Sequence, residues 1–341
     1  MKNIVGIFLI ALTASVAMTG GTIHAQDEPI AGQIRDMIRN EAFTINLLVQ
    51  SGFSYSLYDD DFLGGRTFKV ENARLTFKGQ IDERYYYKIL VNMRSEPNLL
   101  VAFAGYRHSD ALRITTGAMK PSQTADLIID SYATDFVDRA IITGHLVQAR
   151  EIGLAAEGDI NGFYYYSGIF NGSRLNDNNN NKFYGIGRLQ YTFDDVVPGT
   201  LQFGVSGSNG DSPGIRSGNA GPLLRGKRSI YGADVRMETG KTLLAAEYLA
   251  GNVEMADLPD RKEFISGYYL TGGYRFVEKT MALVRWQSWG YRETDFRDNR
   301  LTLGINHDFT GITSLRFNAD AYFPDQGDNH YGLSLIFQVY F

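Results

Sequence analysis

The sequence predicts an all-β protein, a closed antiparallel transmembrane β-barrel of sixteen strands. Apolar and polar residues alternate with period two along most of the chain, an even number of such segments can be counted, and the connections are alternately short and long. The 341 residues include 37 glycines and 8 prolines. This length fits either two ordinary domains or one large barrel.

Composition excludes several other classes of protein. Hydrophobic residues make up 44% of the chain and aromatic residues 13%, which is enough to bury a core and excludes intrinsic disorder. The only apolar run near the length of a membrane-spanning helix lies at the N-terminus, so a helical membrane protein is excluded. The chain has no cysteine, which excludes disulfide scaffolds, thiolate metal sites and cysteine nucleophiles.

The N-terminal residues have the three-part pattern of a secretory signal peptide. Lys2 supplies the basic region, residues 4–18 form an apolar stretch, and Ala25 is a small residue at the cleavage edge. The alternative is an uncleaved membrane anchor, but the stretch is short and turn-forming residues follow it. For the segment after it, a short helix and a frayed terminus are both open. The expected domains are a signal peptide over 1–25, a short periplasmic segment over 26–43 and a transmembrane barrel over 44–341.

Alternation is clear at both ends of the expected barrel. Leu75 and Phe77 alternate with Arg74 and Lys78, and residues 331–341 alternate in the same way. A soluble β-sandwich also alternates, so this pattern alone does not indicate a membrane. The sixteen expected strands are 44–58, 67–80, 85–94, 99–107, 111–119, 147–160, 163–170, 182–193, 200–208, 229–237, 242–252, 264–276, 280–289, 299–309, 313–323 and 331–341.

The connections between these strands sort by parity, which a soluble sandwich has no reason to do. Even-numbered connections are short turns and odd-numbered ones are mostly longer, with 95–98 as the exception. Short turns on one side and long loops on the other are typical of outer-membrane barrels. Tyr and Phe also gather at the strand ends, where a membrane interface favours them. The expected long loops are 59–66, 120–146, 171–181, 209–228, 252–263, 290–298 and 324–330.

Strand parity also predicts the charge of the lumen. If the apolar positions of each strand face lipid, the alternating polar positions face the interior. These inward positions hold more bases than acids. Such a wall attracts anions, unless the bases pair with lumen acids and only brace the barrel. The expected inward acids are Glu157, Asp159, Asp234, Glu247 and Asp320. The expected inward bases are Arg74, Lys78, Lys88, Arg94, Arg113, Arg188, Arg236, Arg275, Arg285 and Arg316.

Several short segments, spread in order along the barrel, carry a family resemblance. They are Val70–Gly79, Gly117–Pro121, Asp135–Ala140, Gly168–Gly172, Leu243–Tyr248, Ala282–Trp286, Leu301–Asn306 and Phe337–Phe341. Together they resemble the phosphate-selective porin O/P family of outer-membrane β-barrel porins. The resemblance implies a homotrimer of sixteen-stranded channels in the bacterial outer membrane.

The resemblance also implies roles for particular residues. Residues 120–146 would be an inward-folded third loop that narrows the pore, with Lys120, Arg139 and His145 in it. The terminal Phe341 would be the signal read by the barrel-assembly machinery. The stretch 122–146 holds one arginine and one histidine against four aspartates, so the family's phosphate site is not expected here.

The function expected from the sequence is a porin for passive diffusion of small hydrophilic solutes, with a preference for anions such as phosphate-like ions. No enzymatic activity, cofactor, metal or nucleic-acid partner is expected, and membrane lipid is the surrounding partner. The Asn-rich stretch 176–182 lacks the spaced carboxylates of a calcium loop. Two alternatives stay open: a barrel-type hydrolase and a plugged structural barrel.

Overall fold

The computed structural model describes residues 43–58, 65–94, 98–178, 180–194, 196, 198–216, 221–256 and 258–341. The expected signal peptide over 1–25 and nearly all of the expected periplasmic segment lie outside these residues. Among the described residues, no helix has the length and hydropathy needed to cross a membrane.

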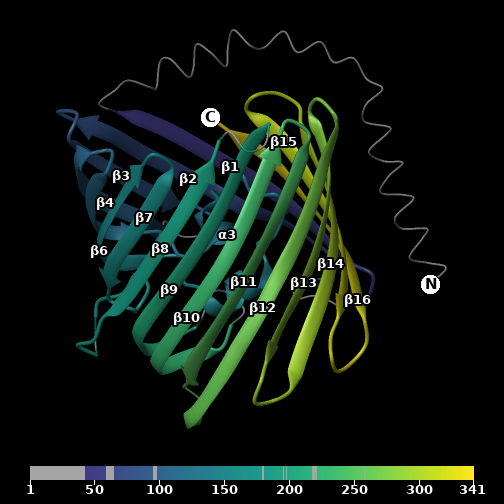
Figure 1. Cartoon of the computed structure of the whole chain (residues 1–341). Coiled ribbons are helices and arrows are strands. Elements are labelled where there is room, and N and C mark those ends of the chain that lie inside the picture. Colours follow the sequence, from purple (N-terminus) through teal and green to yellow (C-terminus); the bar gives the residue numbers. More distant parts are fainter. Residues whose placement is uncertain are drawn as a thin grey trace.

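In this part of the chain, sixteen antiparallel strands close into one barrel (Figure 1). Each strand pairs with its neighbours in sequence, and β1 pairs with β16 to complete the cylinder. The predicted fold class is therefore confirmed. The strands are β1 (Thr44–Ser56), β2 (Thr67–Ile81), β3 (Tyr85–Asn92), β4 (Asn98–Ser109), β5 (Leu112–Met119), β6 (Glu151–Ile160), β7 (Phe163–Phe170), β8 (Tyr184–Phe193), β9 (Gly199–Arg216), β10 (Leu223–Thr239), β11 (Thr242–Met255), β12 (Leu258–Val277), β13 (Thr280–Tyr291), β14 (Phe296–Asp308), β15 (Thr313–Phe323) and β16 (His330–Tyr340).

Successive side chains of these strands point to opposite faces, as the alternation predicts. On the outer face, large apolar residues lie bare: Phe68 is 84% exposed and Leu154 53%. On the inner face, polar side chains such as Arg188 and Asn318 are buried. A water-soluble domain would not expose its apolar face in this way, so the outer surface is suited to lipid tails.

The prediction of three long loops is wrong, because the strands extend into the residues expected to form them. Strands β9 and β10 run to Arg216 and from Leu223, so the loop expected over 209–228 is mostly a paired ribbon. Its Gly- and Ser-rich sequence shows no apolar alternation, but backbone hydrogen bonds do not require it, and a register shift at Leu224/Arg225 absorbs the irregularity. The same extension shortens the loops expected over 252–263 and 290–298.

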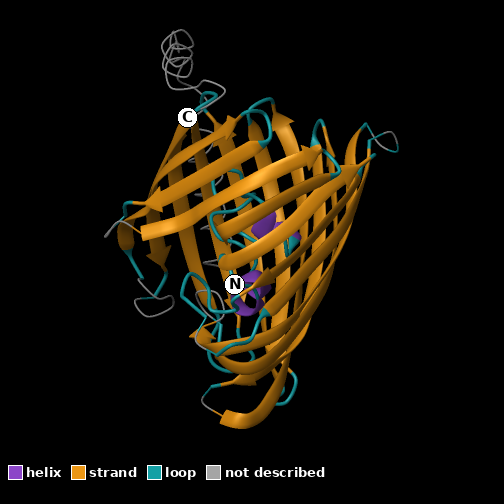
Figure 2. Cartoon of the chain, turned by 90° about the vertical axis from the view of Figure 1, so that its left-hand side faces the viewer, coloured by secondary structure: helices purple, strands orange, loops and turns teal. Residues whose placement is uncertain are grey.

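The connection from β5 to β6 contains two short helices, α3 (Ala125–Ile128) and α4 (Ile141–Leu146). The strand β6 begins at Glu151, four residues later than the sequence indicates, because the connection continues to residue 150. We call this connection the 120–150 segment. Its side chains Ile142 and Leu146 are buried against Leu249 and Trp289, and α4 contacts β11, β12 and β13. Figure 2 shows the helices inside the barrel. The main apolar core therefore joins the segment to the wall.

Candidate functional site

The 120–150 segment hydrogen-bonds mainly to one arc of the barrel. The Glu247 carboxylate of β11 accepts the backbone N–H groups of Ala125 and Asp126 at 2.8 and 3.2 Å. The Gln287 side chain of β13 accepts the N–H of Ile141 at 2.9 Å. Further bonds reach β1, β2, β9, β10, β14, β15 and β16. Most of these bonds reach the arc from β9 to β16, and fewer reach β1 and β2.

On this arc and on the adjacent strand β8, several inward bases are held by acids. Arg188 donates two hydrogen bonds to Asp234, at 2.7 and 2.8 Å, and both side chains are almost fully buried. Arg300 of β14 donates to Asp320 at 2.9 Å. We call the inner faces of β8, β10, β13 and β14, which carry Arg188, Arg236, Arg285 and Arg300, the braced wall.

Three bases of the braced wall contact the 120–150 segment itself, and one of them, Arg300, donates to the Asp138 carboxylate at 3.5 Å. Arg236 donates to both carboxylate oxygens of Asp135, at 2.8 and 3.0 Å. Arg285 lies 4.0 Å from the Asp126 carboxylate, and its guanidinium lies over the Phe136 ring at 4.2 Å. The contacts of Arg188, Arg236 and Arg285 therefore fit bases that pair with acids and brace the barrel better than bases that line the pore without a partner.

The inner faces of β2 to β4 present bases to an open space. A cavity of about 490 Å³ lies between the 120–150 segment and the inner faces of β1 to β4. Acids are fewer around it, namely Glu71, Asp130 and Asp138. The bases that line it are Arg74, Lys88, Arg94, Lys120, Arg139, Arg150 and Arg174. We call the inner faces of β2 to β4, with Arg74, Lys78 and Lys88, together with Arg94 just after β3, the open wall.

The open wall continues toward the short-turn end of the barrel. Lys88 also lines a second cavity of about 440 Å³, together with Lys78, Arg107 and Arg113. Arg113 lies 3.4 Å from the Glu157 carboxylate and is therefore partly neutralised. A row of bases thus runs from Arg94, near the long-loop end, down this wall.

Crowding of cations is visible in the 120–150 segment. Burial, together with the neighbouring charges of Arg74 and Arg139, lowers the pKa of Arg150 to about 10. Burial likewise lowers the pKa of Lys120 to about 8, against the opposing charge of Asp130. The Nε groups of Arg74 and Arg150 are buried without a hydrogen-bond partner in the described part of the chain. An anion in this cavity would relieve both the repulsion and the missing bonds.

The remaining predicted residues lie elsewhere. Arg316 donates to the backbone oxygen of Tyr132, and Arg275 lines a third cavity of about 450 Å³ beside β10 and β14. His145 packs on the Trp289 ring with centroids 3.7 Å apart, and it does not line the large cavity. The N–H of Phe341 donates to Leu47 at 3.2 Å, so the C-terminus pairs with β1.

Sequence reasoning missed several bases of the interior. Arg107 of β4 and Arg300 of β14 have inward parity, which alternation alone could have identified. Arg150 and Arg174 lie in connections, where parity has no meaning and only the folded chain brings them to the cavity. Buried Arg228 faces Glu151 at 3.4 Å and lies over the Tyr184 ring at 3.6 Å.

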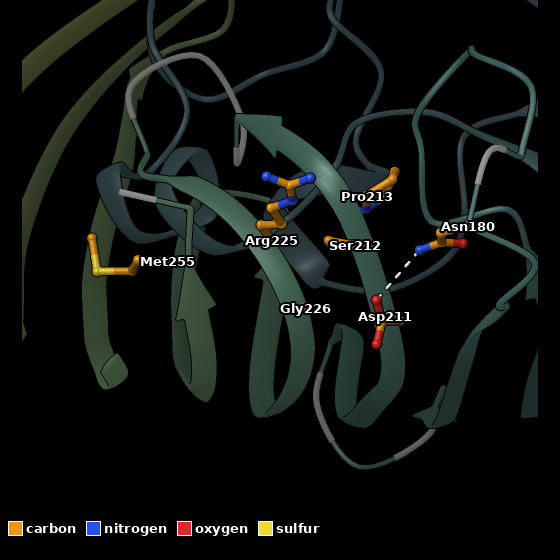
Figure 3. Close-up of a pocket in the computed structure, with 7 residues that line it drawn as sticks. All are labelled: Asn180, Asp211, Ser212, Pro213, Arg225, Gly226 and Met255. Carbon is orange, nitrogen blue, oxygen red and sulfur yellow. Dashed lines mark hydrogen bonds between the residues drawn. The ribbon is translucent and has the colours of Figure 1, made fainter. Parts of the chain in front are cut away.

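A small cavity of about 330 Å³ at the long-loop end includes part of the Asn-rich stretch (Figure 3). There Asn180 donates to Asp211 at 3.3 Å, and Lys182 donates to its other oxygen at 3.0 Å. The one carboxylate is thus already satisfied. No cluster of His, Asp and Glu suited to a metal ion occurs in the described ranges.

Comparisons with known proteins agree with this architecture. A family model for phosphate-selective porin O and P matches residues 43–284. No curated protein matches the chain. The anion-selective porin from Comamonas acidovorans superposes with a TM-score of 0.67 at 12% identity, over 88% of this chain and 99% of that one.

Other solved structures are similar to a comparable degree. The trimer form of OmpT from Vibrio cholerae gives a TM-score of 0.66 at 11% identity, over 88% of this chain and 100% of that one. The outer membrane channel DcaP of Acinetobacter baumannii gives 0.59 at 10% identity, over 88% and 97%. At such identities the likeness shows the fold, and the family match covers most of the barrel.

Proposed function

Because the chain belongs to the phosphate-selective porin O and P family, we propose that it is an outer-membrane porin with a preference for anions. Small hydrophilic solutes would diffuse down their gradient through the lumen, without covalent chemistry and without a cofactor. The open wall is the observation that carries this proposal. Its bases face a cavity and outnumber the acids there, although the whole chain has a formal net charge of -5.

The selectivity would arise from where the bases are neutralised and where they are not. On the braced wall, ion pairs such as Arg188–Asp234 cancel each other's field at a distance. On the open wall, Arg74 donates to the neutral Ser131 hydroxyl at 2.7 Å and keeps its net charge. A narrow wet pore with such a wall raises the local concentration of anions and lowers their barrier.

We further propose that the 120–150 segment is the inward-folded loop that sets the pore width. Its hydrogen bonds to the braced wall would leave the passage along the open wall. Lys120 and Arg139 would then line the narrowest part, whereas His145 would only anchor the segment against Trp289.

Assembly and export complete the proposal. We propose a cleaved signal peptide over residues 1–25, recognition of Phe341 by the barrel-assembly machinery, and a homotrimer in the bacterial outer membrane. The trimer is supported by the trimer form of the Vibrio cholerae protein, which shares the fold.

A barrel plugged by the 120–150 segment is the second candidate, favoured by the many hydrogen bonds of that segment to the wall. A hydrolase is less well supported. His307 does contact the Thr280 hydroxyl at 2.8 Å, but it has lipid-facing parity beside a short turn, not a place in a cleft.

Reversal-potential recordings in planar bilayers test the proposal. Across a tenfold KCl gradient, we expect the reversal potential of the wild type to have the sign of an anion-preferring channel. We expect the Arg74→Gln/Lys88→Gln variant to give a smaller reversal potential of the same sign. A cation-selective potential, or none, would refute the anion preference. Folded protein that inserts without conductance would favour the plugged barrel.

A further inference from the structure

The cavity at the short-turn end of the open wall combines cations with an aromatic surface. About 440 Å³ in volume, it is lined by Lys78 on β2, Lys88 and Tyr86 on β3, and Phe103 on β4. These strands are neighbours in the barrel, so the four side chains form one continuous patch of the inner wall.

The two lysines lie directly opposite each other in the β2–β3 ladder. Like charges at opposed positions destabilise a sheet unless something binds between them. The carboxylates nearby are bound elsewhere: Glu157 faces Arg113 at 3.4 Å and accepts from the Tyr164 hydroxyl at 2.8 Å. The lysine pair is therefore a place where a carboxylate of a solute would be stabilised.

The aromatic part of the patch is held rigidly. A side chain at Gly105 would approach the Tyr86 ring to 2.2 Å, so the ring lies over this glycine. The Tyr86 hydroxyl bonds Thr115 Oγ1 at 2.5 Å, and its ring meets Phe103 edge to face, with centroids 6.1 Å apart. The two rings form a fixed corner, and both remain partly exposed where they line the cavity.

Phe103 also lies directly opposite Lys88 across the β3–β4 ladder. A fixed aromatic surface therefore begins one strand away from the lysine pair, which is about 4.8 Å. A solute in which a carboxylate and an aromatic ring are joined directly carries the two groups that this patch would bind. Inorganic phosphate would use the lysines and leave the rings bare to water, which is unfavourable for an apolar surface.

We propose that this cavity binds aryl carboxylates on their way through the pore, with the carboxylate between Lys78 and Lys88 and the ring against Phe103 and Tyr86. The inference rests on the proposed function, because it names the substrate class of the same passage.

The test is the block of chloride current by benzoate, compared with acetate, in planar bilayers containing the full barrel. For the wild type we expect half-block by benzoate at about one-tenth of the acetate concentration, from ring burial and ring contact together. Phe103→Ala should bring the two anions within about twofold of each other, and Phe103→Tyr should keep the difference. Lys78→Gln/Lys88→Gln should weaken the block by both anions.

Phe203→Ala is the matched control, because Phe203 is an aromatic residue on the outer face of the barrel and is 48% exposed. It should leave both blocking constants unchanged. Equal block by benzoate and acetate in the wild type would overturn the inference, as would a Phe103→Ala channel that retains the difference. In both cases an anion-selective KCl reversal potential would leave the proposed function standing, whereas a cation-selective one would overturn the function itself.

Discussion

The two walls of the lumen carry the same kind of residue in opposite states. On the braced wall, Arg188 and Arg300 are buried in contact with Asp234 and Asp320. On the open wall, Lys78 and Lys88 line cavities with no carboxylate at ion-pair distance in the described part of the chain. A base in a barrel interior can therefore serve structure or transport, and its partner decides which.

The largest expected effect is a loss of stability when an ion pair of the braced wall is removed. Asp234→Leu leaves the buried Arg188 guanidinium without its partner, so we expect the free energy of unfolding to fall by about 3 kcal/mol. Denaturant unfolding in detergent micelles measures this loss. The double variant Arg188→Met/Asp234→Leu should recover most of the stability, since removing both charges removes the desolvation penalty. Equal stability of the single variant and the wild type would refute bracing.

Charge reversal on the open wall should change transport and leave stability nearly intact. Lys78→Glu/Lys88→Glu places two acids in the passage, so we expect the chloride-to-potassium permeability ratio to fall about fivefold, or about 1 kcal/mol. Reversal potentials give the permeability ratio. The temperature at which the band of folded barrel disappears on gel electrophoresis gives the stability. A large loss of stability with unchanged permeability would exchange the roles of the two walls.

The pH dependence sharpens the account of the narrow part. The pKa of Lys120 is lowered to about 8 by burial, so its charge is present at pH 7 and is lost as the pH rises to 9. We expect the anion preference to fall about twofold over this range, since one charge near the passage disappears. Lys120→Gln should show the lower preference at both pH values. A wild-type preference that rises with pH would contradict this assignment.

The smallest expected effect is a change in anion preference when a base of the braced wall loses its acidic partner. Asp135→Asn removes the acid that holds Arg236, which lines the third cavity with Arg275 and Arg316. We expect the anion preference to rise by less than twofold, because Glu238 remains beside Arg236. Single-channel recordings in KCl would detect the change. A shift toward cations would show that Arg236 does not face the passage.

The sequence predicted much of the fold, because a barrel is specified locally. Side chains on a strand alternate, so the apolar positions identified both the strands and the outer face, including exposed Phe68 and Leu154. The ends of β9 to β12 were not predictable in this way. The ribbon that reaches Arg216 is held by backbone pairing and shows little apolar pattern.

The candidate site could be predicted only in part. Parity identified Arg74, Lys78 and Lys88 as inward, but it could not distinguish them from Arg188, whose partner Asp234 lies 46 positions further along the chain. That distinction depends on which strands are neighbours and on where the 120–150 segment rests. Arg150 lies in the connection before β6 and not in the strand expected over 147–160, so it reaches the cavity only through that fold.

The central claim is that the open wall carries the anion preference and the braced wall does not. One measurement tests it directly: the KCl reversal potential of Lys88→Gln beside that of Arg188→Met/Asp234→Leu. We predict a clear fall in anion preference for the first channel and a wild-type potential for the second. A wild-type potential for Lys88→Gln, together with lost selectivity in the double variant, would contradict the account.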